Sequence, residues 1–202
     1  GQDKIYYLIA ESFAAAKDSP LLEIFKKKGV EVLLLSDPVD FLLEGEIREF
    51  QGTTLQSVSR GEIDLSKLKV EEEEKEEQQE SAGETQELLE RLKTVLDEKV
   101  KEVRLTTRLT TSPVCLVVGE YDMDPNLQRL LKASGQTIPS AKPILEINVH
   151  HPIILKLRDE GDEKRFADWA FVLFDQSVLS LGEKLDDPIN FVNRLNGLLA
   201  EA

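Results

Sequence analysis

The residues best suited to metal or acid–base chemistry are two adjacent histidines, His150 and His151, with Glu146 four positions before the first. On a strand, positions 146 and 150 lie on one face, so this carboxylate and imidazole are placed to share a metal ion. A third ligand at a suitable spacing is missing, and His151 precedes Pro152, a pair typical of a helix start. We therefore expect neither a metal site nor a catalytic site here.

Other chemical signatures are also missing from the sequence. Neither a GxxxxGK[ST] phosphate loop nor a GxGxxG turn occurs, so we expect no cofactor and no enzymatic activity in this chain. Cys115 is the only cysteine, which rules out an intrachain disulfide. Its place in the apolar run VCLVV predicts a small core residue and not a nucleophile.

The chain is acidic, and this limits its partners. It has 39 Asp and Glu against 25 Lys and Arg, a formal net charge of −14. Nucleic acid and anionic membranes both attract basic proteins, so we expect neither as a partner. No apolar run approaches the roughly 20 residues that span a bilayer. The chain starts without methionine or a signal peptide, and its lone cysteine suits the cytosol; these features predict a piece of a longer cytoplasmic protein.

The pattern of residues 1–62 predicts a small α/β domain with a parallel sheet. A strand at 5–10, a helix from Ser19-Pro20 to Gly29 and a strand at 30–35 form a crossover unit. The second strand is apolar throughout its middle, which predicts cover on both of its faces. After it we expect a helix from Asp37-Pro38 to about Phe50 and an edge strand at 53–59.

Residues 63–87 predict an acidic linker or helix start, because glutamates crowd together with little apolar surface to bury. A docking tail for a basic partner is the alternative for this run. Residues 88–202 then form a second, α+β domain. It begins with a helix and continues with strands over 103–109 and 114–118, which we expect to pair directly as antiparallel neighbours around Pro113. A short helix around 125–133 and a strand at 144–149 follow.

Two helices, at 162–181 and from Asp187-Pro188 onward, end the chain and carry more apolar residues than one face each. The pattern alone leaves open whether both stripes serve a core within the chain or whether one is a second packing surface. The second alternative predicts a four-helix bundle built by two helical hairpins of a homodimer.

The segment RLTTSPVCLV at 108–117 closely resembles the carboxy-terminal dimerisation domain of the heat shock protein 90 chaperone family. KIYYLIAES at 4–12, KKKGVEVLLLSDPVD at 26–40 and LEIN at 145–148 resemble the same family in the same order. The resemblance therefore covers most of the chain, from the end of the family's middle domain through its dimerisation domain. NVHHP at 148–152 departs from the family's usual turn at two positions.

The resemblance implies a homodimer formed by the terminal helix pair and a surface that binds partly folded client proteins. The implied dimer-interface residues are Phe166, Trp169, Leu173, Phe174, Leu181, Ile189, Val192, Leu195 and Leu199. The implied client-binding residues are Phe41, Leu42, Met123, Leu127, Leu130 and Leu131.

The parent protein implied by the resemblance is an ATP-dependent chaperone that assists protein folding and the stress response, with possible co-chaperones as partners. Its ATP and Mg²⁺ would bind in a domain that precedes Gly1, so this chain should not hydrolyse ATP. The short loop at 134–143 and the chain end are similar to bacterial members. The alternative is a stand-alone dimeric α/β scaffold or adaptor that does not bind clients.

Overall fold

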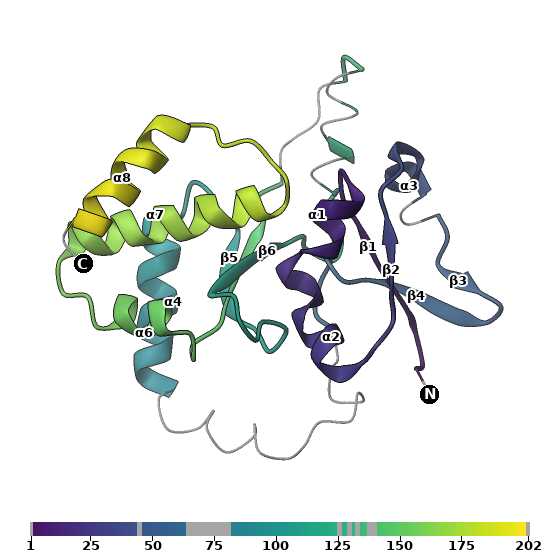
Figure 1. Cartoon of the computed structure of the whole chain (residues 1–202), viewed down its shortest axis with the longest axis horizontal. Helices are drawn as coiled ribbons and strands as arrows, with labels where there is room; N and C mark the ends of the chain where they lie inside the picture. The colour runs from purple at the N-terminus through teal and green to yellow at the C-terminus, as the bar shows by residue number, and fades with distance from the viewer. Residues whose placement is uncertain are drawn as a thin grey trace.

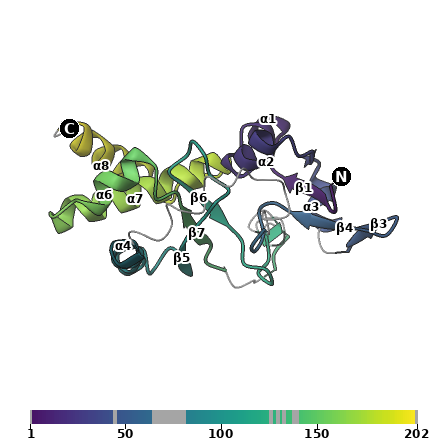
Figure 2. The same ribbon diagram turned by 90° about the horizontal axis from the view of Figure 1, so that it is seen from below.

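The computed structural model describes residues 2–43, 46–63, 82–124, 127–128, 131, 134–136 and 141–200, and only the backbone at Leu42, Leu43 and Ala82. Its fold is mixed α/β, as the sequence predicts. The two views in Figures 1 and 2 place the elements before residue 63 at one end of the molecule and the last three helices at the other.

The first unit is a mixed sheet with short helices. Its elements are β1 (Ile5–Ile9), α1 (Phe13–Lys17), the 3₁₀ helix η1 (Pro20–Leu22), α2 (Glu23–Lys28), β2 (Val32–Leu35), α3 (Pro38–Leu43), β3 (Glu49–Phe50) and β4 (Thr53–Ser57). The strand order is β2-β1-β4-β3, with β1 parallel to both β2 and β4. The predicted parallel pair is confirmed, with Tyr6 opposite Val32.

Local signals set the helix ends of this unit as predicted. The Ser19 hydroxyl accepts a hydrogen bond from the Leu21 amide, which caps η1, and Pro20 occupies its first position. Helix α2 ends at Gly29, whose φ of 63° lies in the left-handed region that glycine adopts without steric cost.

Three predictions for this unit are wrong. The helix from Pro38 ends at Leu43, and Glu49–Phe50 form a strand. Because that strand pairs with β4, β4 is not at the sheet edge. The two edge strands are β3 and β2, and Leu33 on β2 is 53% exposed, so β2 is not covered on both faces.

The second unit is a sheet packed against helices. Its elements are α4 (Ala82–Val95), β5 (Glu102–Leu105), β6 (Val114–Val117), β7 (Ile144–Ile147), α6 (Pro152–Arg158), α7 (Glu163–Ser180) and α8 (Pro188–Ala200). The prediction that β5 and β6 pair directly is wrong, because β7 lies between them, parallel to β5 and antiparallel to β6. The first of these strands also ends at Leu105, four residues earlier than predicted.

Hydrophobic residues cover both faces of the second sheet. On one face, Val103, Leu116 and Leu145 belong to a core shared with α4, α6 and α7. On the other face, Cys115 and Val117 belong to a core that includes residues of β1, α1, η1 and α2. The two units therefore share buried apolar surface. The boundary at 63–87 remains a prediction, since residues 64–81 of that linker lie outside the described residues.

Candidate functional site

A buried ion-pair network joins the two units. Glu146 on β7 and Arg108 are 2% and 3% exposed, and Arg108 Nε lies 2.6 Å from Glu146 Oε2. Arg104 on β5 donates to Glu146 Oε1 at 2.7 Å. The same arginines reach the first unit, because Arg108 donates to the carbonyl of Val58 at 2.7 Å and both donate to that of Gly61. Each buried charge thus has an opposite charge and hydrogen-bond partners, as burial requires.

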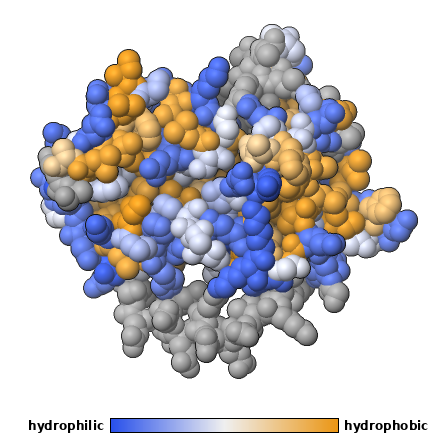
Figure 3. All heavy atoms as spheres, in the orientation of Figure 1, coloured by the Kyte–Doolittle hydropathy of each residue, from blue (hydrophilic) through white to orange (hydrophobic). Residues whose placement is uncertain are grey.

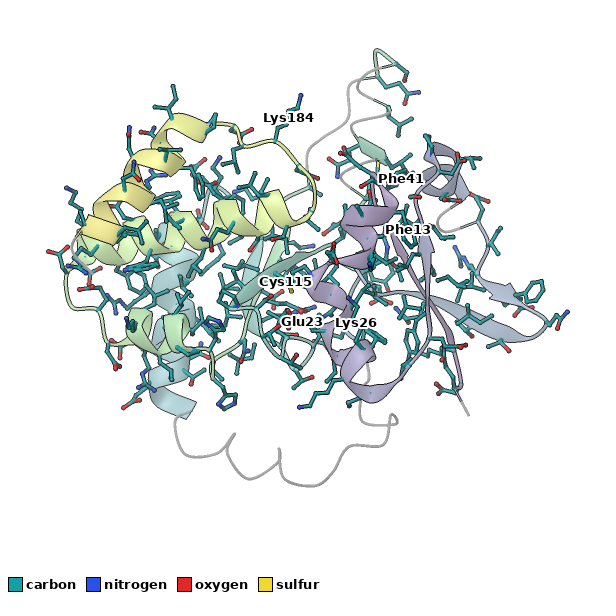
Figure 4. The ribbon with its side chains drawn as sticks, viewed as in Figure 1. Phe13, Glu23, Lys26, Phe41, Cys115 and Lys184 are labelled. Atoms are coloured by element: carbon teal, nitrogen blue, oxygen red, sulfur yellow. The ribbon has the colours of Figure 1, made fainter. Side chains whose placement is uncertain are left out.

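A second polar contact between the units is made by Glu23 of α2. Its carboxylate accepts hydrogen bonds from the backbone amides of Thr110, Thr111 and Ser112 and from the Ser112 hydroxyl, at 2.5–3.2 Å. Burial raises the pKa of Glu23, but these hydrogen bonds favour the ionised form and lower its pKa overall. Figure 4 shows Glu23 on α2, on the side of the first unit that faces the second.

Cys115 lies where the two units contact each other and has the properties of a core residue, as predicted. It is buried, and its thiol lies 3.9 Å from Glu146 Oε2. Burial, followed by the negative charge of Glu146, raises the pKa of the Cys115 thiol far above its ordinary value. The thiolate is the nucleophilic form of cysteine, so this thiol is chemically inert in the folded chain.

His151, one of the two histidines considered above and expected not to bind a metal, has a structural role. His151 caps α6, with its Nδ1 accepting from the Ile153 amide at 3.2 Å. The Glu146 carboxylate is occupied by the two arginines. Within the described ranges, no three His, Cys, Asp or Glu side chains come together as metal ligands. A cavity of about 770 Å³ is bordered by Arg104, Thr106, Glu146 and His150, but its charged lining is already paired internally.

Two of the predicted client-binding residues meet although they are far apart in sequence. Phe41 on α3 forms a buried cluster with Tyr7 and Ile9 of β1, and Leu127 packs against that cluster together with Leu35 and Leu55. The alternation of β1 explains the meeting, because Tyr6 and Leu8 face the other core. Figure 4 labels Phe41 on α3.

The remaining predicted client residues differ in exposure. Met123 is 36% exposed, Leu127 and Leu131 are half-buried, and both leucines lie in helical conformation. The side chain of Leu42 and all of Leu130 lie outside the described residues. Tyr121, two positions before Met123, is 93% exposed.

The predicted dimer-interface residues divide between core and surface. On α7, Phe166, Leu173 and Phe174 are buried in the core of the second unit, and Trp169 and Leu181 pack against it half-buried. The Asp162 carboxylate caps this helix by accepting from the Arg165 amide at 2.9 Å. The three fully buried side chains thus support the hairpin from inside the chain and present no surface of their own.

Helix α8 packs on α7 through one side and exposes an apolar stripe. Leu198 is buried, and the Arg194 guanidinium lies 4.2 Å from the ring centroid of Phe171 on α7. Ile189, Val192 and Leu199 are 73%, 49% and 63% exposed. At 100° per residue these three and the half-buried Leu195 fall within an arc of about 120°, an apolar stripe that the described part of the chain leaves largely exposed. Figure 3 shows apolar surface over this hairpin.

The sequence predictions missed the residues that hold these surfaces in place. Tyr7, Ile9 and Leu55 complete the cluster around Phe41, and Arg60 contacts the segment that carries Tyr121. In the sequence, a charged residue inside an apolar strand, such as Glu146 in LEIN, is the signal that could have predicted the buried ion-pair network. No spacing or motif indicates Arg60.

A comparison with protein families and a comparison with single known proteins both match the chain along nearly its whole length. The family model described as "Hsp90 protein" matches residues 1–202. The chain is similar to proteins named "Chaperone protein HtpG": 57% identical over 199 residues in Aromatoleum aromaticum, 56% over 199 in Nitrosococcus oceani and 52% over 201 in Alkalilimnicola ehrlichii. These alignments cover 98%, 98% and 100% of this chain but 30–31% of each relative. The chain thus spans about a third of their length.

Proposed function

The chain belongs to the Hsp90 protein family, and we propose that it is the dimerisation and client-binding portion of a molecular chaperone. The observation that carries the proposal is the uncovered apolar stripe on α8, with Ile189, Val192 and Leu199 facing solvent. A helix that already packs on α7 through Leu198 needs no second apolar stripe in a monomer.

The proposed partner for this stripe is the same hairpin of a second copy. Two α7–α8 hairpins related by twofold symmetry make a four-helix bundle in which each stripe covers the other. A specific interface of standard size buries roughly 800 Å² on each partner. The half-buried Trp169 and Leu181 extend the available apolar surface along α7. Because the buried α7 residues anchor the hairpin, we expect it to keep its shape on pairing.

The proposed client surface is the exposed edge of the cluster that joins the two units. Leu127 packs against the Phe41 cluster, and Met123, four positions earlier in the sequence, is 36% exposed. Methionine is flexible and polarisable, which suits contact with varied apolar segments. We also propose Leu42, Leu130 and Leu131 as contacts on the resemblance to the family.

The stand-alone scaffold is the alternative proposal, and a dimer without client affinity would favour it. We propose further that this chain does not hydrolyse ATP, that ATP and Mg²⁺ act elsewhere in the longer chaperone, and that it works in the cytoplasm, with possible co-chaperones. No helix in the described part of the chain is long and apolar enough to cross a membrane.

Aggregation of a chemically denatured protein, followed by light scattering, tests client binding. The chain should suppress aggregation at near-stoichiometric amounts, and Met123→Ser with Leu127→Ser should reduce this effect. A matched pair, Leu105→Ser with Leu155→Ser, removes exposed leucines remote from this surface and should not. Absence of suppression by a folded, dimeric chain would favour the scaffold.

A further inference from the structure

A loop that follows β6 is held against the first unit by backbone pairing. The Val118 amide donates to the Ser59 carbonyl at 2.8 Å, and the Gly61 amide donates to the Val118 carbonyl at 2.9 Å. This pairing places Arg60 directly beside residues 119–122, which lead from the second sheet to the helical segment containing Leu127.

The Arg60 side chain holds the backbone of this loop. Its Nη1 donates to the carbonyls of Gly119 and Glu120, each at 3.4 Å, and to that of Asp122. The two N–H groups of this one nitrogen are shared among three carbonyls of one loop, with Asp122 as the nearest acceptor. The contact holds the loop against the first unit, because a charged donor makes stronger hydrogen bonds than a neutral one.

The second unit holds the same loop from its other side. Lys101 Nζ lies 3.0 Å from Asp122 Oδ2, and the carboxylate of Asp122 lies over Gly119, where any Cβ atom would collide with it. After the loop, the Asp124 carboxylate accepts from the Leu127 amide at 3.4 Å, and Gln128 donates to the Met123 carbonyl at 2.8 Å. The backbone from 119 to 124 is thus fixed by polar contacts on both sides.

What this fixed loop presents to solvent is apolar surface. Tyr121 is 93% exposed and Met123 36% exposed, beside the cluster that Leu127 joins. A tyrosine has only two side-chain torsions to restrict, so on a fixed backbone it binds a partner at low entropic cost. Of the two carboxylates that flank Tyr121, Asp122 is paired with Lys101 and Glu120 is exposed, and the chain carries a net charge of −14.

We propose that Arg60 is a positioning residue for client binding and that Tyr121 is an additional contact with the client. Arg60 fixes residues 119–122 so that Tyr121 and Met123 extend the surface around Leu127. The occupant is an unfolded segment whose apolar side chains are accompanied by Lys or Arg, which the exposed Glu120 and the net charge of −14 favour. This inference rests on the proposed client-binding function and adds to it the residue that organises the site.

The test measures binding of reduced, carboxamidomethylated hen lysozyme, a basic unfolded protein, to the full chain by fluorescence anisotropy. Reduced, carboxymethylated α-lactalbumin serves as the acidic comparison and should bind more weakly. Tyr121→Ala and Arg60→Met should each weaken lysozyme binding by about fivefold, the loss typical of one anchoring side chain or its ordering. Arg60→Lys should fall between, because one ammonium group reaches fewer of the carbonyls.

Amide hydrogen exchange separates positioning from general destabilisation. Arg60→Met should accelerate exchange in residues 119–123, and Tyr121→Ala should not. Arg91→Met is the matched control, since Arg91 also donates to a carbonyl, that of Glu160, and stacks 3.9 Å from the Phe166 ring centroid, remote from the loop. It should leave client binding unchanged.

The outcomes separate the two levels of the proposal. If the unchanged chain binds neither unfolded protein, the proposed client function fails and this inference fails with it. If the chain binds but Arg60→Met and Tyr121→Ala bind equally well, or Arg91→Met weakens binding as much, Arg60 is not a positioning residue and client binding stands without it. Stronger binding of the acidic protein overturns the assigned occupant.

Discussion

Replacing Glu146 with glutamine should break the contact between the two units at its centre. The neutral amide keeps the shape of the side chain but removes the buried negative charge that pairs with both Arg104 and Arg108. Arg108 is 3% exposed and cannot turn to solvent without opening the boundary. Glu62 lies 3.8 Å from Arg104 but is exposed, so it compensates little.

The expected loss is large compared with the stability of the whole chain. Removing one partner of a buried ion pair typically costs about 3–5 kcal/mol. Globular domains unfold with about 5–15 kcal/mol in total. For a chain of this size each kcal/mol lowers Tm by about 2–4 °C, so Glu146→Gln should lower it by roughly 6–20 °C.

Glu163→Gln is the matched control, because Glu163 pairs with Arg91 at 3.1 Å on the surface. An exposed pair contributes about 0–1 kcal/mol to stability, so this variant should melt close to the unchanged chain.

Cys115 supplies a second measurement, since it is the only thiol and lies beside Glu146 where the two units contact each other. Its reaction with a thiol reagent should be at least about 100-fold faster in Glu146→Gln, as opening becomes easier. Equal melting temperatures and equal thiol protection in the two variants would refute the argument that this network holds the units together.

Three further perturbations follow from single residues. Glu23 has a lowered pKa in the folded chain, so its hydrogen bonds to residues 110–112 stabilise the fold above its ordinary value of 4.5 and are lost as pH falls below it; the Tm difference between the unchanged chain and Glu23→Gln should shrink on acidification, and a pH-independent difference would contradict this. Burial raises the pKa of Asp175, only partly offset by nearby cations, so its ionised form destabilises the fold at neutral pH; Asp175→Asn should raise Tm at pH 7 by an amount that decreases toward pH 4, and a lowered Tm at pH 7 would be the wrong sign. Gly29→Ala should cost about 1 kcal/mol at its left-handed φ, whereas Gly83→Ala in helix α4 should be neutral or stabilising, as urea unfolding of both would show.

Sequence reasoning succeeded where structure is set by neighbours along the chain. Ser19-Pro20, His151-Pro152 and Asp162 each begin a helix at the predicted position, because capping involves residues only two or three apart. The amphipathic pattern also predicted α7 and α8. These signals are local, so they do not depend on how the sheets are ordered.

The errors concern contacts between distant segments. The insertion of β7 between β5 and β6 depends on a strand about 30 residues further along, and no local pattern reports strand order. The same holds for Leu33, whose exposure follows from the position of β2 at the sheet edge. For the candidate site, apolar residues were predicted on both sides of the linker, but the contact of Leu127 with the Phe41 cluster required the fold. The division of the α7 stripe into buried and half-buried residues required it as well.

The central claim is that α8 pairs two copies of this chain, and sedimentation equilibrium tests it most directly. The unchanged chain should sediment at twice its mass of 22.8 kDa. Ile189→Asp with Val192→Asp should sediment as a folded monomer, because charges on the exposed stripe oppose pairing and leave the α7 core intact. Leu155→Asp, which places a charge at an exposed leucine of α6, should remain a dimer. A monomeric unchanged chain, or a stable dimer of the Ile189→Asp, Val192→Asp variant, would contradict the assignment of α8 as the pairing surface.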